Sequence, residues 1–202
     1  MNLLSNPALR RFFSGRRRFQ IDWFFFFMLI LSARQYPQAF GIAVCFIGAT
    51  LRFWASGFLR KEKKLAVGGP YSFTRNPLYL GRFIMVLGAT MSVGAWALAA
   101  VMSVVFFLNY HYVIEHEELK LGTEEYFGPV YFEYKKLVPR FIPALTPAPR
   151  AELERVNPDP EVYRFSLPLA NENRAMEAYV TFFGLILGMA VLVFVKKSFH
   201  WA

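Results

Sequence analysis

The segment Ala178–Val195 reads AYVTFFGLILGMAVLVFV and carries no charged side chain. A helix needs about 20 predominantly apolar residues to cross a bilayer, so this segment with its flanks predicts a membrane-spanning helix. The rest of the chain is similarly apolar: 55% of its 202 residues are hydrophobic and 23 are phenylalanine. Such a composition is too apolar for a soluble domain of this length. The expected fold class is therefore all-α, a polytopic integral membrane protein.

Four more apolar runs precede this segment, and they cover about Phe19–Ser32, Ala39–Leu59, Leu78–Ser92 and Ala95–Ile114. The last two are joined through Val93-Gly94, which fits a tight helical hairpin. No small-residue cleavage site ends the first run, so we expect a retained helix rather than a signal peptide. The first and third runs are short and need their flanks or a tilt to span. The pattern predicts about five transmembrane helices plus a short cytosolic helical segment after the fourth.

The basic residues predict the topology. Five arginines lie within the first twenty residues, and the loop after the second run holds Arg60, Lys61, Lys63 and Lys64. Because Lys and Arg concentrate in cytoplasmic loops, both regions are expected in the cytosol. The expected location is an inner or cytoplasmic membrane, multi-pass, with the polar chemistry facing the cytosol. The net charge of +9 then matches anionic membrane lipids as partners, and no nucleic-acid partner is expected.

The chain divides into three expected regions. Residues 1–143 form a membrane core, 144–174 a proline-rich connector, and 175–202 an additional C-terminal transmembrane helix. In that helix Gly184 and Gly188 have the small-xxx-small spacing that allows close helix packing, against the core or against a second copy in a homo-oligomer. A lipid-facing anchor with incidental glycines is the alternative. One cysteine and three histidines without a close pair predict no metal site.

The stretch GGPYSFTRNPLYLGRF, Gly68–Phe83, is unusually polar for a chain of this composition. Its Gly-Gly-Pro sequence predicts a tight turn, since glycine accepts positive φ and proline fixes the next φ. Pro77 suits the first turn of a helix. Arg75 and Asn76 are then expected at that helix N-terminus, where free N–H groups suit an anionic ligand group. The alternative is a simple helix cap with a snorkelling arginine.

A second polar cluster follows the fourth run. Glu115, His116, Glu117 and Glu118 stand where the chain is expected to leave the bilayer. They could form a solvated first turn, or they could hydrogen-bond ribose or amino groups of a cofactor. Tyrosines, phenylalanines and basic residues then alternate between residues 126 and 143. That strip indicates an interfacial helix at headgroup level, able to close over an active site.

Together, GPYSFTRNPLYLG and, one hairpin later, EHEELKLGTEEYFGPVYFEYKKLVPRFIP resemble the isoprenylcysteine carboxyl methyltransferase family. That family lies within a wider group of membrane methyltransferases that includes phospholipid N-methyltransferases. The resemblance covers roughly Arg52–Pro143. It implies S-adenosylmethionine as methyl donor, bound on the cytosolic side, and a lipophilic small-molecule or lipid acceptor.

The resemblance also implies site residues. The cofactor-binding positions it implies are Leu65, Ala66, Tyr71, Asn76, Pro77, Leu78, Tyr79, Glu117 and Glu118. For catalysis, Arg75 and Arg140 would hold an acceptor carboxylate, which we expect ahead of an amine, and Glu118 would take the proton if the acceptor were an amine. Asn76 stands where the eukaryotic enzymes carry histidine, the spacing from Glu118 to Phe127 departs from the family pattern, and the fifth helix has no place in its minimal core.

Two other functions remain open at this point. One is a membrane sterol-type reductase using a reduced nicotinamide, which has a related helical scaffold and a similar turn. The other is a non-enzymatic membrane assembly protein on the same scaffold. The acidic cluster after the fourth run fits a sulfonium cofactor better than a nicotinamide.

Overall fold

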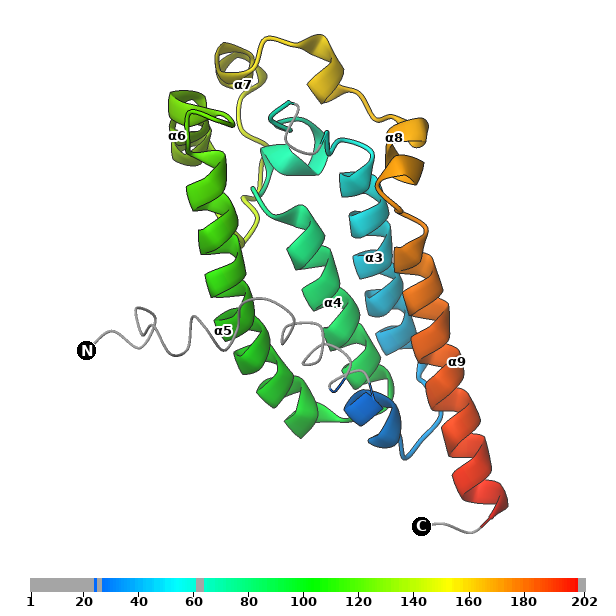
Figure 1. Cartoon of the computed structure of the whole chain (residues 1–202). Coiled ribbons are helices and arrows are strands. Elements are labelled where there is room, and N and C mark those ends of the chain that lie inside the picture. The colour runs from blue at the N-terminus through cyan, green and yellow to red at the C-terminus, as the bar shows by residue number, and fades with distance from the viewer. Residues whose placement is uncertain (1–23, 25–26, 61–63, 200–202) are drawn as a thin grey trace, which may run out of the picture. The chain divides into compact units, whose positions relative to one another are not determined.

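The computed structural model describes residues 24, 27–60 and 64–199, and their regular secondary structure is helical apart from one isolated antiparallel bridge between Arg60 and Lys64. Figure 1 shows the arrangement of its helices. In chain order they are α3 (Ala39–Ser56), α4 (Pro77–Ser92), α5 (Trp96–Leu121), α6 (Gly128–Leu137), α7 (Arg150–Val156), α8 (Leu167–Glu172) and α9 (Glu177–Ser198), with short 3-10 helices at Gly69–Ser72 and Pro160–Tyr163. The all-helical class is confirmed for these residues.

Three described helices are long and apolar enough to cross a membrane: α3, α5 and α9. The expected count of about five spans is not confirmed. The third predicted span, α4, has 16 residues, which at 1.5 Å per residue reach only about 24 Å. Half of the first predicted run, Phe19–Ser32, lies outside the described residues. Among its described residues, 24 and 27–31 are helical.

The chain forms two compact units. One, here called the helical unit, comprises Met1–Gly48, Phe83–Glu115 and Tyr179–Ala202. The other, the polar unit, comprises Ala49–Arg82 and His116–Ala178. Helices α3, α4, α5 and α9 each supply residues to both units.

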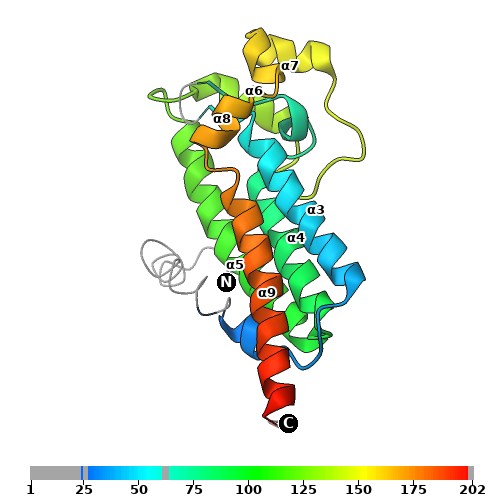
Figure 2. The same ribbon diagram turned by 90° about the vertical axis from the view of Figure 1, so that its right-hand side faces the viewer.

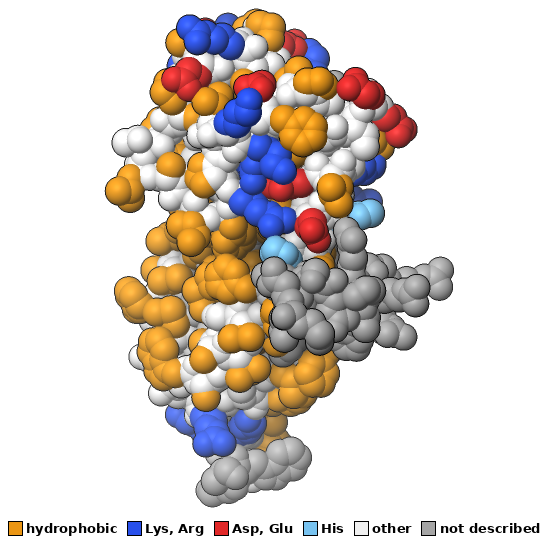
Figure 3. Space-filling model, turned by 90° about the vertical axis from the view of Figure 1, so that its left-hand side faces the viewer, with side chains coloured by type: hydrophobic (Ala, Val, Ile, Leu, Met, Phe, Trp, Pro, Cys, Tyr) orange, Lys and Arg blue, Asp and Glu red, His pale blue; other side chains and the backbone are white. Residues whose placement is uncertain are grey.

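In the helical unit, α9 has one packed face and one open apolar face. Phe182, Leu185, Met189 and Val193 are buried, whereas exposed residues three or four positions apart form the other face: Val180, Phe183, Leu187, Val191 and Phe194. The ring of Phe182 lies 5.5 Å from that of Phe46 on α3, which places these helices side by side (Figure 2). An open face of this kind suits contact with lipid. Figure 3, viewed from the side of α5, shows a further broad apolar surface.

Two glycine positions of the helical unit show how closely its segments pack. A Cβ added at Gly88 of α4 would lie 2.2 Å from the backbone nitrogen of Cys45 on α3, so only glycine allows this approach. Between α4 and α5 the chain turns at Gly94, whose φ is +69°. The phenyl ring of Phe83 on α4 lies 5.0 Å from that of Phe106 on α5. The tight hairpin predicted at Val93-Gly94 is therefore present.

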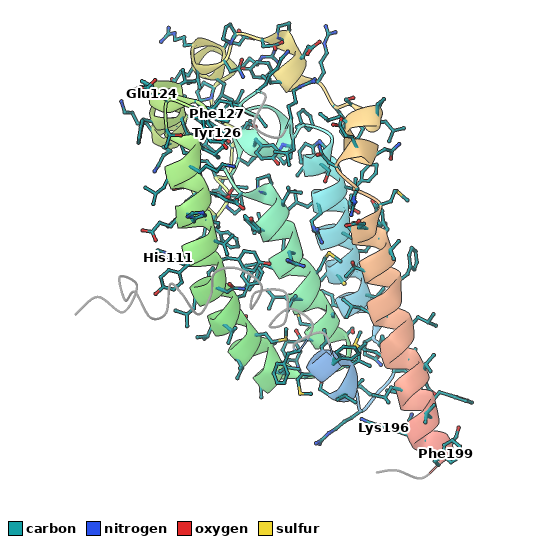
Figure 4. The ribbon with its side chains drawn as sticks, in the orientation of Figure 1. His111, Glu124, Tyr126, Phe127, Lys196 and Phe199 are labelled. Atoms are coloured by element: carbon teal, nitrogen blue, oxygen red, sulfur yellow. The ribbon has the colours of Figure 1, made fainter. Side chains whose placement is uncertain are left out.

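The two glycines of α9 have different surroundings. Gly188 packs against Ile30, whose Cδ1 would lie 3.2 Å from an added Cβ, while Gly184 faces open space. Near the end of α9, the Lys196 ammonium donates hydrogen bonds to the carbonyls of Leu31 and Ala33 at 2.9 and 3.0 Å (Figure 4). A cation is favourable at such a helix C-terminus. Self-association through α9 stays a prediction.

The polar unit has its own apolar core. Its fully enclosed members come from three parts of the chain: Leu65, Val67, Tyr131, Tyr134, Val138, Leu153 and Val162. Two of them, Leu153 and Val162, lie in the segment expected to be an irregular connector. Prolines delimit its short helices, because Pro149 precedes α7 while Pro160 and Pro168 sit in first turns, where their missing N–H costs nothing. The segment is folded and packed, and the boundaries proposed for it stay a prediction.

Candidate active site

The polar stretch Gly68–Phe83 begins with the predicted tight turn. Gly69 has a φ of +55°, which glycine adopts without strain, and the Tyr71 amide donates to the Gly68 carbonyl at 3.1 Å. After the turn, the Arg75 amide donates to the Pro139 carbonyl at 2.9 Å, and the Asn76 side-chain amide donates to the Arg140 carbonyl at 2.8 Å. Residues 75–76 are thus fixed against the chain that follows α6, and α4 starts at Pro77 as expected.

A buried carboxylate with three cationic neighbours forms the centre of the site. Glu118 Oε1 lies 3.0 Å from Arg75 Nη2, and Oε2 lies 3.4 Å from Lys135 Nζ and 3.7 Å from Arg140 Nε. The side chains of Glu118 and Arg75 are only 9% and 8% exposed. A charge this deeply buried needs such partners, because desolvation otherwise costs several kcal/mol. With three cations around one carboxylate, the cluster carries an excess of positive charge.

The neighbouring glutamate has a different partner. The Tyr79 hydroxyl donates to Glu117 Oε1 at 2.5 Å. Tyr79 lies in the first turn of α4 and Glu117 in the last turns of α5. Adjacent glutamates therefore offer two environments, one enclosed by cations and one held by a neutral phenol.

Three tyrosines line the same region and remain neutral. Burial raises the pKa of the Tyr71, Tyr131 and Tyr134 hydroxyls above the ordinary value of a phenol. Tyr134 donates its hydroxyl to the Tyr71 carbonyl at 2.6 Å. The buried Tyr71 hydroxyl and Arg75 Nε have no hydrogen-bond partner among the described residues. Since buried polar atoms are normally paired, both atoms are available to a ligand.

These groups surround a cavity of about 290 Å³ that lies entirely within the polar unit. That volume is at the small end of the range for small-molecule pockets. Its lining comprises Leu59, Lys64, Leu65, Ala66, Tyr71, Arg75, Asn76, Pro77, Leu78, Tyr79, Glu117, Glu118, Leu121, Phe127, Tyr131 and Tyr134. In Figure 3 basic side chains lie against acidic ones on one face of the protein.

All nine predicted cofactor positions and Arg75 line this cavity. Arg140 does not: its guanidinium lies near Glu118 and its carbonyl accepts from Asn76. The predicted site residues did not include the lining residues Leu59, Lys64 and Leu121. Phe127, Tyr131, Tyr134 and Lys135 were expected only as part of the strip able to close over an active site. Their roles in binding stay predictions.

The helical spacing in α6 could have separated the residues of the strip that face the cavity from those that face away from it. Tyr131, Tyr134 and Val138 are three to four positions apart and buried, whereas Phe132 is 51% exposed. The aromatic strip therefore has an inner face toward the site and an outer face. Figure 4 shows Phe127 in the turn from α5 to α6, together with Glu124 and Tyr126.

The central part of the chain is similar to known proteins. The phospholipid methyltransferase family model matches residues 42–128. The cobalt-zinc-cadmium resistance protein CzcN of Cupriavidus metallidurans is 32% identical over 108 residues, 52% of this chain and 47% of that protein. The nickel-cobalt-cadmium resistance protein NccN of Alcaligenes xylosoxydans xylosoxydans is 31% identical over the same length, 52% of this chain and 48% of that protein.

A third relative carries an enzyme name. The protein-S-isoprenylcysteine O-methyltransferase of Schizosaccharomyces pombe is 34% identical over 85 residues, 42% of this chain and 35% of that protein. No solved structure matches. The chain spans at most about half the length of these curated relatives. Over the matched part, the predicted resemblance to the isoprenylcysteine carboxyl methyltransferase family is confirmed.

Proposed function

We propose that this chain, whose central part belongs to the membrane methyltransferases related to isoprenylcysteine carboxyl methyltransferase, uses S-adenosylmethionine to methylate a lipophilic acceptor. The observation that carries the proposal is the cavity of the polar unit. It combines Arg75 and Lys64 with Glu117, Glu118 and an aromatic wall. Three apolar helices long enough to span a bilayer support a membrane location.

The residues of the cavity fit this cofactor. When bound, S-adenosylmethionine supplies an activated methyl group on a sulfonium. Its carboxylate suits the Arg75 side of the cavity, where Nε lacks a partner among the described residues. Its cationic groups suit Glu117 and the faces of Tyr131 and Phe127, since aromatic rings attract cations. The Tyr71 hydroxyl is available to a ribose hydroxyl.

The protein's own contribution would be alignment and exclusion of water. A displacement at a methyl group needs the two reactants held in line, and an enclosed site favours this. The three buried tyrosines stay protonated because burial raises their pKa values, so they would donate hydrogen bonds and would not act as bases.

We infer that the acceptor is a carboxylate. Arg75, Lys135 and Arg140 outnumber Glu118, so the cluster favours an anion and repels an ammonium group. A carboxylate is already nucleophilic and needs no base. An acceptor with its tail in lipid would reach the site from the membrane. We propose that the site faces the cytosol, in keeping with the basic loops.

Calorimetry with S-adenosylhomocysteine tests the proposal. The parent protein should bind it, while Glu117→Gln and Glu118→Gln should each weaken binding by about tenfold to a hundredfold, the usual cost of losing a charge-assisted hydrogen bond. Asn76→Ala should also weaken binding, because the Asn76 amide lines the cavity and donates to the Arg140 carbonyl. Glu124→Gln is the matched control, because Glu124 is exposed and does not line the cavity. A parent protein that binds no S-adenosylhomocysteine would refute the methyltransferase assignment.

The names of two relatives favour a second candidate. Both are described as metal resistance proteins, so a non-enzymatic accessory role in metal resistance would also explain the shared scaffold. The same calorimetry separates the two functions. A parent that binds no S-adenosylhomocysteine but restores metal tolerance to a deletion strain would support the accessory role.

A further inference from the structure

A segment beyond the family match lies behind one wall of the cavity. We call residues 57–60 and 64–68 the wall segment, because Leu59, Lys64, Leu65 and Ala66 line the cavity. We call residues 157–166, which lie between α7 and α8, the strap. The family match ends at residue 128, so the strap belongs to the part of the chain that the family comparison leaves unexplained.

Polar contacts join the strap to the wall segment at three points. The Asn157 side-chain amide donates to the Leu65 carbonyl at 2.9 Å. Lys64 Nζ lies 2.5 Å from Asp159 Oδ2 and 2.9 Å from Glu161 Oε2. Arg60 Nη2 donates to the Glu161 carbonyl at 3.1 Å. We call the ion pairs of Lys64 with Asp159 and Glu161 the latch.

Apolar and backbone contacts also join the strap to the wall segment. A Cβ at Gly68 would lie 2.5 Å from the Val162 carbonyl oxygen, so the two backbones touch. Val162 is fully buried beside Leu65 and Val67. At the other end, the Ser166 amide donates to the Gly57 carbonyl at 3.0 Å, and the Phe165 ring lies against Gly57.

No strap residue lines the cavity, yet the strap contacts the wall segment along most of its described length. We propose that Asn157, Asp159 and Glu161 are positioning residues that hold the wall segment in place and thereby set the affinity of the cavity for its cofactor. This inference rests on the proposed methyltransferase function. Lys64 connects the cavity to the strap, because its side chain lines the cavity and its ammonium belongs to the latch.

Thermodynamic linkage gives a direct readout. If the strap stabilises the binding-competent wall, a ligand in the cavity must stabilise the strap by the same coupling free energy. Hydrogen exchange of the full chain in detergent should therefore slow at the Arg164 and Ser166 amides when S-adenosylhomocysteine is added, although neither residue touches the cavity.

Two strap variants and one control test the positioning role by calorimetry. Asn157→Asp keeps the acceptor for the Asp159 amide but loses the donor to Leu65, and Asp159→Asn with Glu161→Gln removes the latch charges. Each should raise the Kd for S-adenosylhomocysteine by about twofold to tenfold, the scale of one or two net hydrogen bonds. Glu154→Gln is the matched control, because it breaks an exposed ion pair with Arg150 on the adjacent α7 and leaves the wall segment untouched.

The stoichiometry of binding separates positioning from damage to the fold. A positioning role raises Kd while the number of sites per protein stays that of the parent, whereas misfolding lowers the number of sites and leaves Kd unchanged. Parental Kd values in both strap variants, or unchanged exchange at the strap, would overturn the inference. A parent that binds no S-adenosylhomocysteine would instead refute the proposed function.

Discussion

In the helical unit the closest contacts bring backbones together, as where Gly88 meets Cys45, whereas the polar unit holds a cluster of charges around the buried Glu118. Buried hydroxyls of the helical unit bond to their own helix: Thr90 donates to the Leu87 carbonyl, and Ser92 to that of Ala89. In the polar unit, side chains bond to partners far along the chain, such as Tyr134 to Tyr71 and Asn157 to Leu65.

This difference shows which forces define each unit. A helix in lipid must satisfy its polar groups internally, so packing of small and apolar groups sets its neighbours. The polar unit uses specific long-range hydrogen bonds and ion pairs, each of which leaves a costly unpaired group when one partner is removed. Substitutions should therefore act by steric overlap in the helical unit and by loss of a partner in the polar unit.

The largest effect is expected at Glu118. Replacing it by Gln leaves the nearly buried Arg75 without its counter-ion, and removing one partner of a buried ion pair costs about 3–5 kcal/mol. Reversible denaturation in detergent should show a fall in the free energy of unfolding toward that size. Glu124→Gln, an exposed position, should change it by less than about 0.5 kcal/mol. Equal stability of the two variants would mean that the charge cluster does not hold the polar unit together.

The matching test in the helical unit is steric. Gly88→Leu forces a side chain into the Cys45 backbone and should lower the free energy of unfolding by about 1–3 kcal/mol or more, as overpacking does. Gly184→Leu, on a helix face with nothing within 4 Å, is the control and should cost little. A tolerated Gly88→Leu would show that the α3–α4 contact is looser than the structure indicates.

Sequence patterns predicted much of the helical unit. The Val93-Gly94 hairpin and the span at α9 followed from local rules of hydropathy and turn chemistry. The count of about five spans is not confirmed, because hydropathy alone does not separate a membrane span from a shorter apolar helix such as the 16-residue α4. Of the two α9 glycines predicted to allow close helix packing, Gly188 packs against Ile30 and Gly184 faces open space.

In the polar unit, the resemblance pointed to residues that line one cavity, but it did not predict how they pair with one another. Arg75 and Arg140 were both expected to hold a substrate carboxylate, yet each lies within 4 Å of the protein's own Glu118. The strap could not be predicted, because its contacts with the wall segment join positions about a hundred apart with no periodic pattern.

Tyr134→Phe tests a single long-range hydrogen bond of the polar unit. The substitution removes the donor to the Tyr71 carbonyl and leaves that buried acceptor unpaired, which should cost about 1–3 kcal/mol of the free energy of unfolding. Tyr126→Phe, at the partly exposed turn after α5, should be neutral. Because Tyr71 lines the cavity, the Tyr134 variant should also weaken S-adenosylhomocysteine binding. A loss of stability without any change in S-adenosylhomocysteine binding would mean that the hydrogen bond from Tyr134 to Tyr71 does not affect the cavity.

The smallest effect is expected at the latch, and it depends on pH. The hydrogen bonds and charge of Lys64 lower the pKa values of Asp159 and Glu161, and those two carboxylates raise the pKa of Lys64. The Arg60 guanidinium also lowers both carboxyl pKa values. A lowered carboxyl pKa gives stability that is present above the ordinary value and lost as pH falls through the folded value. A raised lysine pKa gives stability that is lost only as pH rises through its own folded value.

The latch is therefore intact between about pH 5 and pH 10. Its ion pairs are partly exposed, since Lys64 is 42% and Glu161 58% accessible, so solvent screening keeps their contribution small.

The melting temperature of the parent should exceed that of Asp159→Asn with Glu161→Gln by a constant, small margin across this window. The two curves should converge below about pH 4, where the carboxylates of the parent take up protons. Added salt should narrow the margin at neutral pH in the same way, because it screens exposed charges. A margin that persisted in acid would mean that the variant acts through packing of the strap and not through the charges of Asp159 and Glu161.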